Sequence, residues 1–172
     1  GELGPWITKN FKARDYERDG RFRFQILQLT PDGKNFKLYQ SAINMAEPYS
    51  VPSSLSKEVE AVAGTYMEVD DPWAFMDGWM APELYLDQLQ MHANWWGNAT
   101  KYVLEHQQWD MAFSWVGTID HIEHVLYAGI EPKARVYDPD KADFCWHMIR
   151  ETYRQVDENI GRILDAVDLD NT

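Results

Sequence analysis

Two carboxylates and two histidines fall within five consecutive residues, the stretch DHIEH at positions 120–124. If this stretch is helical, Asp120 and His124 are four residues apart and project from the same face. A carboxylate oxygen and an imidazole nitrogen so placed can bind one divalent ion of the zinc or manganese type. The spacing alone also fits a helix start in which Asp120 is the N-cap and the histidines are satisfied by hydrogen bonds.

The other histidines of the chain fit structural roles, and His147 pairs with Asp143 at ordinary helical spacing. His121 and Glu123 belong to the same stretch, but His121 is expected to be exposed or hydrogen-bonded nearby and Glu123 to be solvated. His92 and His106 fall in a predicted helix, where packed or surface positions are the default interpretation.

Further acidic and hydroxyl side chains fit structural roles better than chemical ones. Asp70, Asp71 and Asp77 lack the ligand spacing of a calcium loop and predict a solvated acidic loop. Four serines lie between residues 50 and 56, but no glycine elbow or base accompanies them. They are interpreted as loop and capping residues.

The elements around the DHIEH stretch are expected to be α/β in style. A continuous apolar run, MAFSWVGT at residues 111–118, is typical of a strand buried on both faces. Sites in open α/β sheets gather beyond the carboxyl ends of such strands. Apolar residues at helical spacing predict two long helices, at 82–107 and 142–167.

The N-terminal half has a different pattern, which predicts strands and one short helix. Residues 21–29 and 36–43 predict an antiparallel hairpin around a Pro-Asp-Gly turn. A short helix is expected at 57–63, ended by Gly64. The predicted organisation is a hairpin and cap region at residues 1–81 and a helix-strand-helix piece at 82–172. Taken alone, such a piece would be classed as α+β.

Composition excludes several classes of protein. The 172 residues are 45% apolar with eight Trp, which argues against disorder. A formal charge of −12 disfavours binding to nucleic acid or anionic membranes. The single cysteine, Cys145, excludes an intrachain disulfide and a cysteine-cluster metal site.

Targeting signals are not visible in the sequence. The longest nearly apolar stretch, residues 111–119, is about half of what a membrane span needs. The chain shows no basic, apolar leader of the signal-peptide type. These observations leave the compartment open, with a slight preference for the cytoplasm.

Six short stretches, distributed over almost the whole chain, are similar to motifs of a known family and occur in the same order. They are GELGPW at residues 1–6, RFRF at 21–24, LYQSAIN at 38–44, PYSVP at 48–52, DHIEH at 120–124 and YRQVDENIG at 153–161. This set resembles the type I phosphodiesterase/nucleotide pyrophosphatase branch of the alkaline phosphatase superfamily, in particular its predicted phosphohydrolase/phosphomutase members. Gly4 stands where the family motif has a serine.

The resemblance implies that Asp120 and His124 are the D-x-x-x-H ligands of one metal ion. In that family two ions, usually zinc, flank a Thr or Ser nucleophile, polarise the phosphoryl group and activate the attacking hydroxyl or water. No counterpart of the nucleophile segment or of the second ligand set is found here. The chain therefore resembles a middle segment with no catalytic residue of its own, expected to be inactive alone. The complete enzyme would act on a small-molecule phosphate ester.

Two other functions are compatible with the sequence. In a noncatalytic binding module, the aromatic loop 73–79 and the hairpin would form a ligand or partner surface without metal. In a cap domain, the hairpin would control access of substrate. A middle segment of a larger enzyme also predicts an apolar patch near residues 109–115 or at Trp95 and Trp96, which self-association would cover in part.

Overall fold

The computed structural model describes residues 4–13, 16–46, 48–67 and 70–171. Its strands are β1 (Ile7–Ala13), β2 (Tyr16–Phe22), β3 (Phe24–Leu29), β4 (Phe36–Gln40) and β5 (Asn44–Met45). Its helices are α1 (Ser54–Ala63), α2 (Pro72–Met76), α3 (Pro82–His106), α4 (Thr118–Ile130) and α5 (Pro139–Leu164). The fold of this described part is thus mixed, with antiparallel strands first and helices after them.

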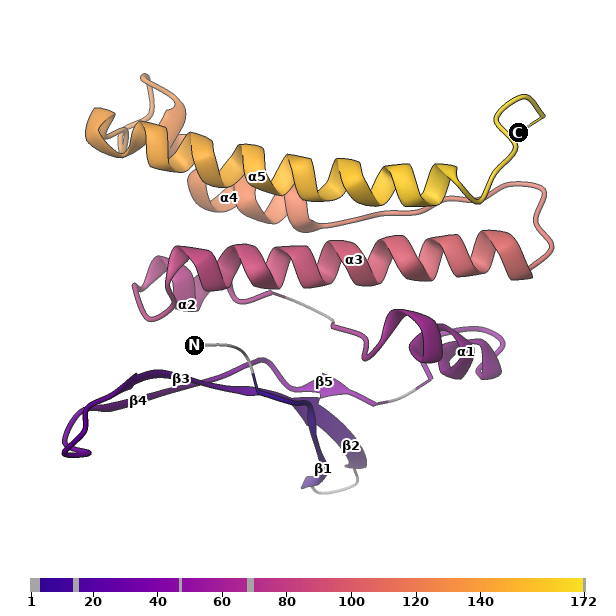
Figure 1. Ribbon diagram of the computed structural model, residues 1–172, viewed down its shortest axis with the longest axis horizontal. Coiled ribbons are helices and arrows are strands. Elements are labelled where there is room, and N and C mark those ends of the chain that lie inside the picture. The colour runs from indigo at the N-terminus through magenta and orange to yellow at the C-terminus, as the bar shows by residue number, and fades with distance from the viewer. Residues whose placement is uncertain (1–3, 14–15, 47, 68–69, 172) are drawn as a thin grey trace.

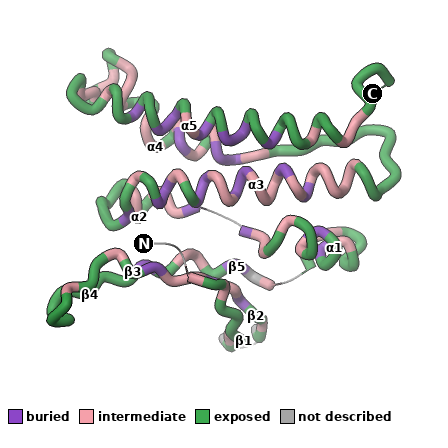
Figure 2. The backbone as a smooth tube through the Cα atoms, in the orientation of Figure 1, coloured by how far each residue is buried: buried purple, intermediate pink, exposed green. Residues whose placement is uncertain are grey.

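The helices make up one side of the molecule. Helices α3 and α5 run side by side, and α4 packs against α5, whereas the strands and α1 lie on the other side of α3 (Figure 1). Buried residues concentrate along α3, α4 and α5, and much of the strand region is exposed (Figure 2). No helix in the described ranges is both long and apolar enough to cross a membrane.

The predicted hairpin is confirmed. Strand β3 pairs antiparallel with β4, so that Phe24 lies opposite Gln40 and Leu29 opposite Phe36. The Pro-Asp-Gly turn joins them, and its Gly33 has a φ of 72°, a conformation that glycine adopts without strain. The hairpin starts later than predicted, because Arg21 and Phe22 belong to β2.

A second, three-stranded sheet was not predicted. Its strand order is β1-β2-β5, and both pairings are antiparallel. Of the N-terminal stretch 1–6 that carries part of the family resemblance, residues 1–3 lie outside the described residues. Gly4 donates its backbone N–H to the carbonyl oxygen of Phe24 at 2.8 Å, which ties this stretch to β3.

Tyr39 connects the hairpin to the helices. Its ring is buried with the helical core, and its hydroxyl donates to Oδ2 of Asp71 at 3.2 Å. The same hydroxyl accepts a hydrogen bond from Nε2 of Gln88 at 2.8 Å. A separate contact joins the strands to α1, where Arg21 on β2 forms an ion pair with Glu60 at 2.8 Å. These polar contacts position the strand region against α1, α2 and α3.

The two long helices are confirmed to within a few residues. Helix α3 begins at Pro82 as predicted, and proline suits this first helical position because its missing N–H would be unpaired there. Helix α5 begins three residues before the predicted start, since the Asp138 side chain accepts the N–H of Asp140 at 3.1 Å and caps the helix. The short helix α1 begins at Ser54, three residues before the predicted start, and ends as predicted before Gly64, which has a φ of 83°.

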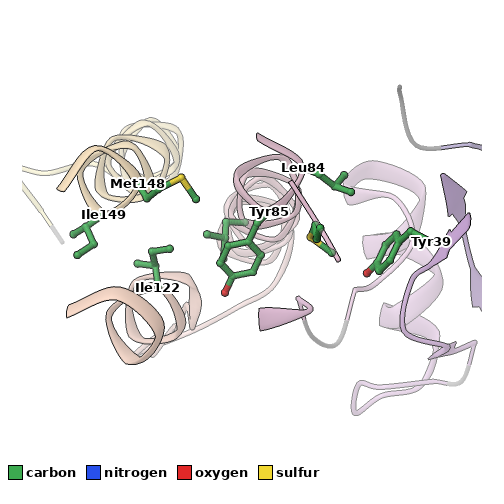
Figure 3. Packing of buried hydrophobic residues seen from close by; sticks show 8 residues of the cluster. Tyr39, Leu84, Tyr85, Ile122, Met148 and Ile149 are labelled. Carbon is green, nitrogen blue, oxygen red and sulfur yellow. The ribbon is translucent and has the colours of Figure 1, made fainter. Parts of the chain in front are cut away.

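The apolar core lies where α3, α4 and α5 meet. Figure 3 shows Tyr85 of α3 facing Ile122 of α4, with Met148 and Ile149 of α5 beside them. Tyr85 and Ile122 are completely buried, as is Leu89 one turn further along α3. Burial of such large side chains is the main stabilising contribution to a core of this size.

The prediction of a buried strand at residues 111–118 is wrong. Thr118 begins helix α4, and residues 111–117 form an extended segment without strand pairing. Met111, Phe113 and Trp115 are 73%, 92% and 73% exposed. An apolar run becomes a buried strand only where other strands pair with it, and no described strand lies alongside this one. The segment instead contacts α3, where Ser114 Oγ accepts a hydrogen bond from Nε1 of Trp96 at 2.6 Å.

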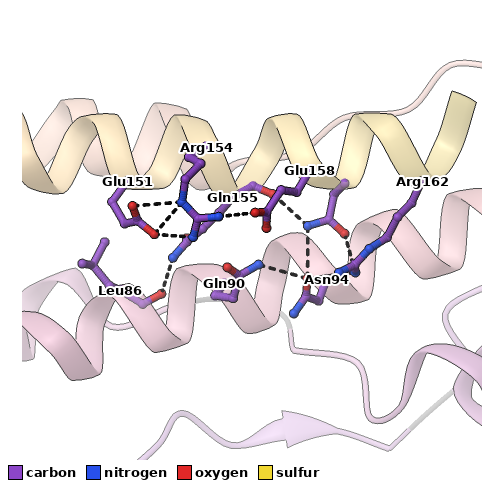
Figure 4. A network of polar contacts seen from close by, with 9 residues as sticks. Leu86, Gln90, Asn94, Glu151, Arg154, Gln155, Glu158 and Arg162 are labelled. Atoms are coloured by element: carbon purple, nitrogen blue, oxygen red, sulfur yellow. Dashed lines mark hydrogen bonds and ion pairs between the residues drawn. The ribbon is translucent and has the colours of Figure 1, made fainter.

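A polar network fixes the spacing of α3 and α5. Figure 4 shows Gln155 and Arg162 of α5 reaching toward Leu86 and Asn94 of α3. Arg162 donates to the Asn94 side chain at 3.1 Å, and Gln155 donates to the carbonyl oxygen of Leu86 at 3.3 Å. Asn159, fully buried on the same face of α5, also donates to Asn94 at 3.1 Å.

We expect Gly97→Ala to destabilise the protein by about 1–2 kcal/mol, although alanine favours helices over glycine by about 1 kcal/mol. A Cβ at position 97 would lie 2.3 Å from Oδ1 of Asn159, a side chain held in place by its hydrogen bonds. Overpacking of this kind typically costs about 1–3 kcal/mol. Urea denaturation measures the change.

Gly161→Ala is the matched control for this substitution. Gly161 lies in α5, and a Cβ there would meet nothing within 4 Å. The control should stabilise the protein by about 0.5–1 kcal/mol. Equal stabilisation by both substitutions would contradict the close approach of α3 and α5.

Candidate metal centre

The stretch 120–124 lies in the first turns of α4, so Asp120 and His124 project from one face. His124 Nε2 lies 3.4 Å from Oδ1 of Asp120, and the two side chains are 79% and 60% exposed. Two ligands of a tetrahedral zinc ion, each about 2.0–2.1 Å from the metal, lie about 3.4 Å apart. The pair therefore fits two positions of one coordination sphere.

Buried residues on the inner face of α4 keep Asp120 and His124 on its solvent-facing side. Thr118 and Ile122 are completely buried and anchor the first turns of the helix. The N–H of His121 donates to the carbonyl oxygen of Gly117 at 2.9 Å and closes the first helical turn. Because these contacts fix the inner face, Asp120 and His124 remain in solvent on the outer one.

A hollow of about 440 Å³ opens beside α2 and α4. It is lined by Asp70, Pro72, Trp73, Met76, His121, His124 and Val125. Most of this lining is apolar, with two imidazoles and one carboxylate among it. The hollow can therefore admit a small ligand next to His124.

A second group of titratable side chains lies on the inner side of this hollow. One potential ligand atom from each of Asp70, His92 and His121 lies within 4.8 Å of the other two. His121 Nδ1 is 2.5 Å from Oδ1 of Asp70, and the Tyr85 hydroxyl donates to Oδ2 at 2.6 Å. The Asp70 side chain is 1% exposed, so both of its oxygens are held by protein groups.

Burial dominates the electrostatics of this group. It lowers the pKa of His92, which is 9% exposed, and the nearby Asp70 carboxylate only partly opposes this shift. His92 is therefore neutral at pH 7, and its Nδ1 is buried with no hydrogen-bond partner among the described residues. Burial and the Asp70 carboxylate raise the pKa of Tyr85, so its hydroxyl stays protonated and donates.

The structure places Asp70 differently from the sequence prediction. Asp70 is buried, so the prediction of a solvated acidic position is wrong for this residue. Asp71 accepts the N–H of Ala74 at 3.0 Å and caps α2. An Asp directly before a Pro-initiated helix was the available signal for that cap.

His121 and His92 make contacts that their interpretation from the sequence did not include. His121 is hydrogen-bonded as expected, but to a residue 51 positions away rather than nearby. His92 is packed, as expected, and follows Leu89 and Tyr85 by three and seven residues along the buried face of α3. That spacing was the signal for its burial, whereas its approach to His121 depends on the tertiary fold.

The remaining candidates have structural roles. His106 is exposed and stacks on Tyr102, with ring centroids 4.2 Å apart. Glu123 accepts a hydrogen bond from the Tyr153 hydroxyl at 2.7 Å. Ser50, in the loop before α1, and Ser56, in the first turn of α1, share a hydrogen bond at 2.6 Å. These contacts account for the side chains without a reaction.

Comparison with known proteins finds no match for this chain among family models, curated sequences or solved structures.

Proposed function

We propose that this chain is part of a metal-dependent phosphohydrolase of the phosphodiesterase/nucleotide pyrophosphatase or phosphomutase type. The observation that carries the proposal is the Asp120–His124 pair, whose ligand atoms are 3.4 Å apart on an exposed face beside the hollow. The reaction class is supported by the resemblance of the ordered motifs, among them the D-x-x-x-H of Asp120 and His124, to the phosphodiesterase/nucleotide pyrophosphatase family. Residues 1–81 would serve as the inserted hairpin and cap, and 82–172 as a piece of the alkaline-phosphatase-like core.

Asp120 and His124 would hold one ion, zinc by preference and manganese as a second choice. When bound, the ion supplies Lewis-acid polarisation of a phosphoryl group and activation of the attacking oxygen. As ligands, Asp120 would contribute a carboxylate oxygen and His124 an imidazole nitrogen. The complete enzyme is expected to bind two ions.

Further groups are needed for turnover. Among the described residues, no third His, Cys, Asp or Glu joins this pair to form a three-ligand group. We therefore expect the purified chain to hydrolyse neither phosphate mono- nor diesters, because positioning and charge stabilisation need the remaining ligands and a nucleophile. Metal-dependent turnover that Asp120→Ala abolishes would contradict this expectation.

We also propose that the chain associates with a second copy through residues 109–117. This segment exposes Met111, Phe113 and Trp115, which occupy alternate positions along a backbone without strand pairing. Exposed apolar patches of this kind mark surfaces that become covered.

A noncatalytic binding module remains the second candidate function. The observation that favours it is the exposure of Trp73 and Trp79, at 72% and 73%, around α2. Trp73 lines the hollow, where its ring could stack on an apolar or aromatic ligand.

Paramagnetic Mn²⁺ separates the two candidates, because it broadens the NMR signals of nuclei near its binding site. We expect Mn²⁺ to broaden the amide signals of residues 120–125 first. Asp120→Asn and His124→Asn should each remove this effect, since either substitution leaves a single ligand. Glu123→Gln in the same turn is the control and should leave the broadening unchanged. Broadening elsewhere only, or equal broadening in all variants, would reject the metal pair.

A further inference from the structure

We propose that Asp70, His92 and His121 form a second, buried zinc site, separate from the Asp120–His124 pair. The three side chains come from three different elements, namely the segment before α2, helix α3 and helix α4. A zinc ion bound to all three would therefore link parts of the chain that are distant in sequence.

The donor set suits zinc. One carboxylate oxygen and two imidazole nitrogens are the protein ligands of many zinc sites with a fourth position open to water. Magnesium and calcium prefer oxygen ligands and would be poor occupants of a site with two nitrogens. Cys145, the single thiol of the chain, is not a member of this group.

The distances require only a small adjustment. The ligand atoms lie at most 4.8 Å from one another, and a tetrahedral zinc site needs about 3.4 Å between them. Side-chain movements of about 1 Å would bring them to a common ion. Zinc would also replace the hydrogen bond between His121 Nδ1 and Oδ1 of Asp70, and the neutral His121 ring would then carry its proton on Nε2.

Two features of the surroundings favour a cation at this position. A carboxylate that is 1% exposed carries a large desolvation cost unless positive charge or hydrogen bonds offset it. The buried Nδ1 of His92 has no hydrogen-bond partner in the described part of the chain, whereas buried polar groups are normally satisfied. A zinc ion would bind the carboxylate oxygen that pairs with His121 and would supply a partner for an imidazole nitrogen of His92.

A supporting contact and an access route are also present. The Tyr85 hydroxyl holds Oδ2 of Asp70, as outer partners commonly orient carboxylate ligands, and leaves Oδ1 directed at His121. The His121 side chain is 27% exposed and lines the hollow together with Asp70. A water molecule in this hollow would complete the coordination.

The test is a Zn²⁺ titration of the metal-free chain against a chromophoric chelator, repeated with Co²⁺ as a spectroscopic probe. We expect the wild-type chain to bind one equivalent of Zn²⁺ at this site and to give the visible absorption of a four-coordinate Co²⁺ site. Asp70→Asn and His92→Phe should each weaken binding by more than about tenfold, since even loss of an outer partner commonly costs about 10- to 100-fold. Asparagine keeps hydrogen-bonding groups for Tyr85 and His121, so a folded variant is available.

Two controls assign the site. His106→Asn removes an exposed imidazole from the same helix as His92 and should leave the affinity unchanged. Asp120→Asn removes a ligand of the other pair and should also leave this equivalent in place. The proposal is overturned if wild type binds no Zn²⁺ tightly, if Asp70→Asn and His92→Phe bind it as well as wild type, or if Asp120→Asn abolishes the binding.

Discussion

Asp70→Ala should lower the free energy of unfolding by about 3–5 kcal/mol. The carboxylate accepts hydrogen bonds from the buried Tyr85 hydroxyl at 2.6 Å and from His121 at 2.5 Å. Hydrogen bonds to a charged group contribute about 1.5–3 kcal/mol each, and the completely buried Tyr85 would keep a hydroxyl without an acceptor. Chemical denaturation with a metal chelator present measures this loss without any contribution from bound ions.

Two further variants serve as controls for the stability loss of Asp70→Ala, namely the conservative Asp70→Asn and the exposed Asp77→Ala. The side-chain amide introduced by Asp70→Asn can accept from Tyr85 and donate to the other tautomer of His121, so we expect a loss of only about 1–2 kcal/mol. Asp77 is exposed at the end of α2, and its substitution should change stability by about 0.5 kcal/mol or less. A loss below about 1 kcal/mol in Asp70→Ala would show that this carboxylate is not a buried acceptor.

The features predicted correctly from the sequence depend on local patterns. The periodic apolar residues of α3 and α5 indicate a helix whatever packs beside it. The predicted bounds of both helices are therefore within a few residues of the observed ones. The Asp120–His124 geometry likewise follows from helical spacing, and their distance of 3.4 Å agrees with it. Whether these two residues bind metal stays a prediction.

The features that were missed depend on contacts between distant residues. Residues 111–117 have the composition of a buried strand, but burial of a strand depends on neighbours that the run itself cannot specify. Asp70 and His121 meet across 51 residues, and no motif joins them in sequence. Only the packing of α3 against α4 and the loop before α2 brings His92 to them. The second metal group therefore could not be predicted from spacing.

Phe113→Ser combined with Trp115→Ser should abolish most of the self-association proposed for the 109–117 segment. These side chains are 92% and 73% exposed, and burial of a large apolar side chain contributes about 1.5–3 kcal/mol. The double variant would lack the contributions of both side chains to the contact between copies. Its association constant should therefore be lower by about two to four orders of magnitude, since 1.4 kcal/mol corresponds to a factor of ten.

Sedimentation equilibrium over a range of protein concentrations measures this association. The matched control is Trp79→Ser, which removes a ring that is 73% exposed but lies outside the segment, beside α2, and should leave the association constant unchanged. The two substituted positions lie in an extended segment away from the core cluster of α3, α4 and α5, so folding should persist in the variant. A wild-type chain that stays monomeric at all concentrations would mean that the exposed aromatic side chains do not form an interface between copies. Equal weakening by Trp79→Ser would place the contact at α2 and contradict the assignment to residues 109–117.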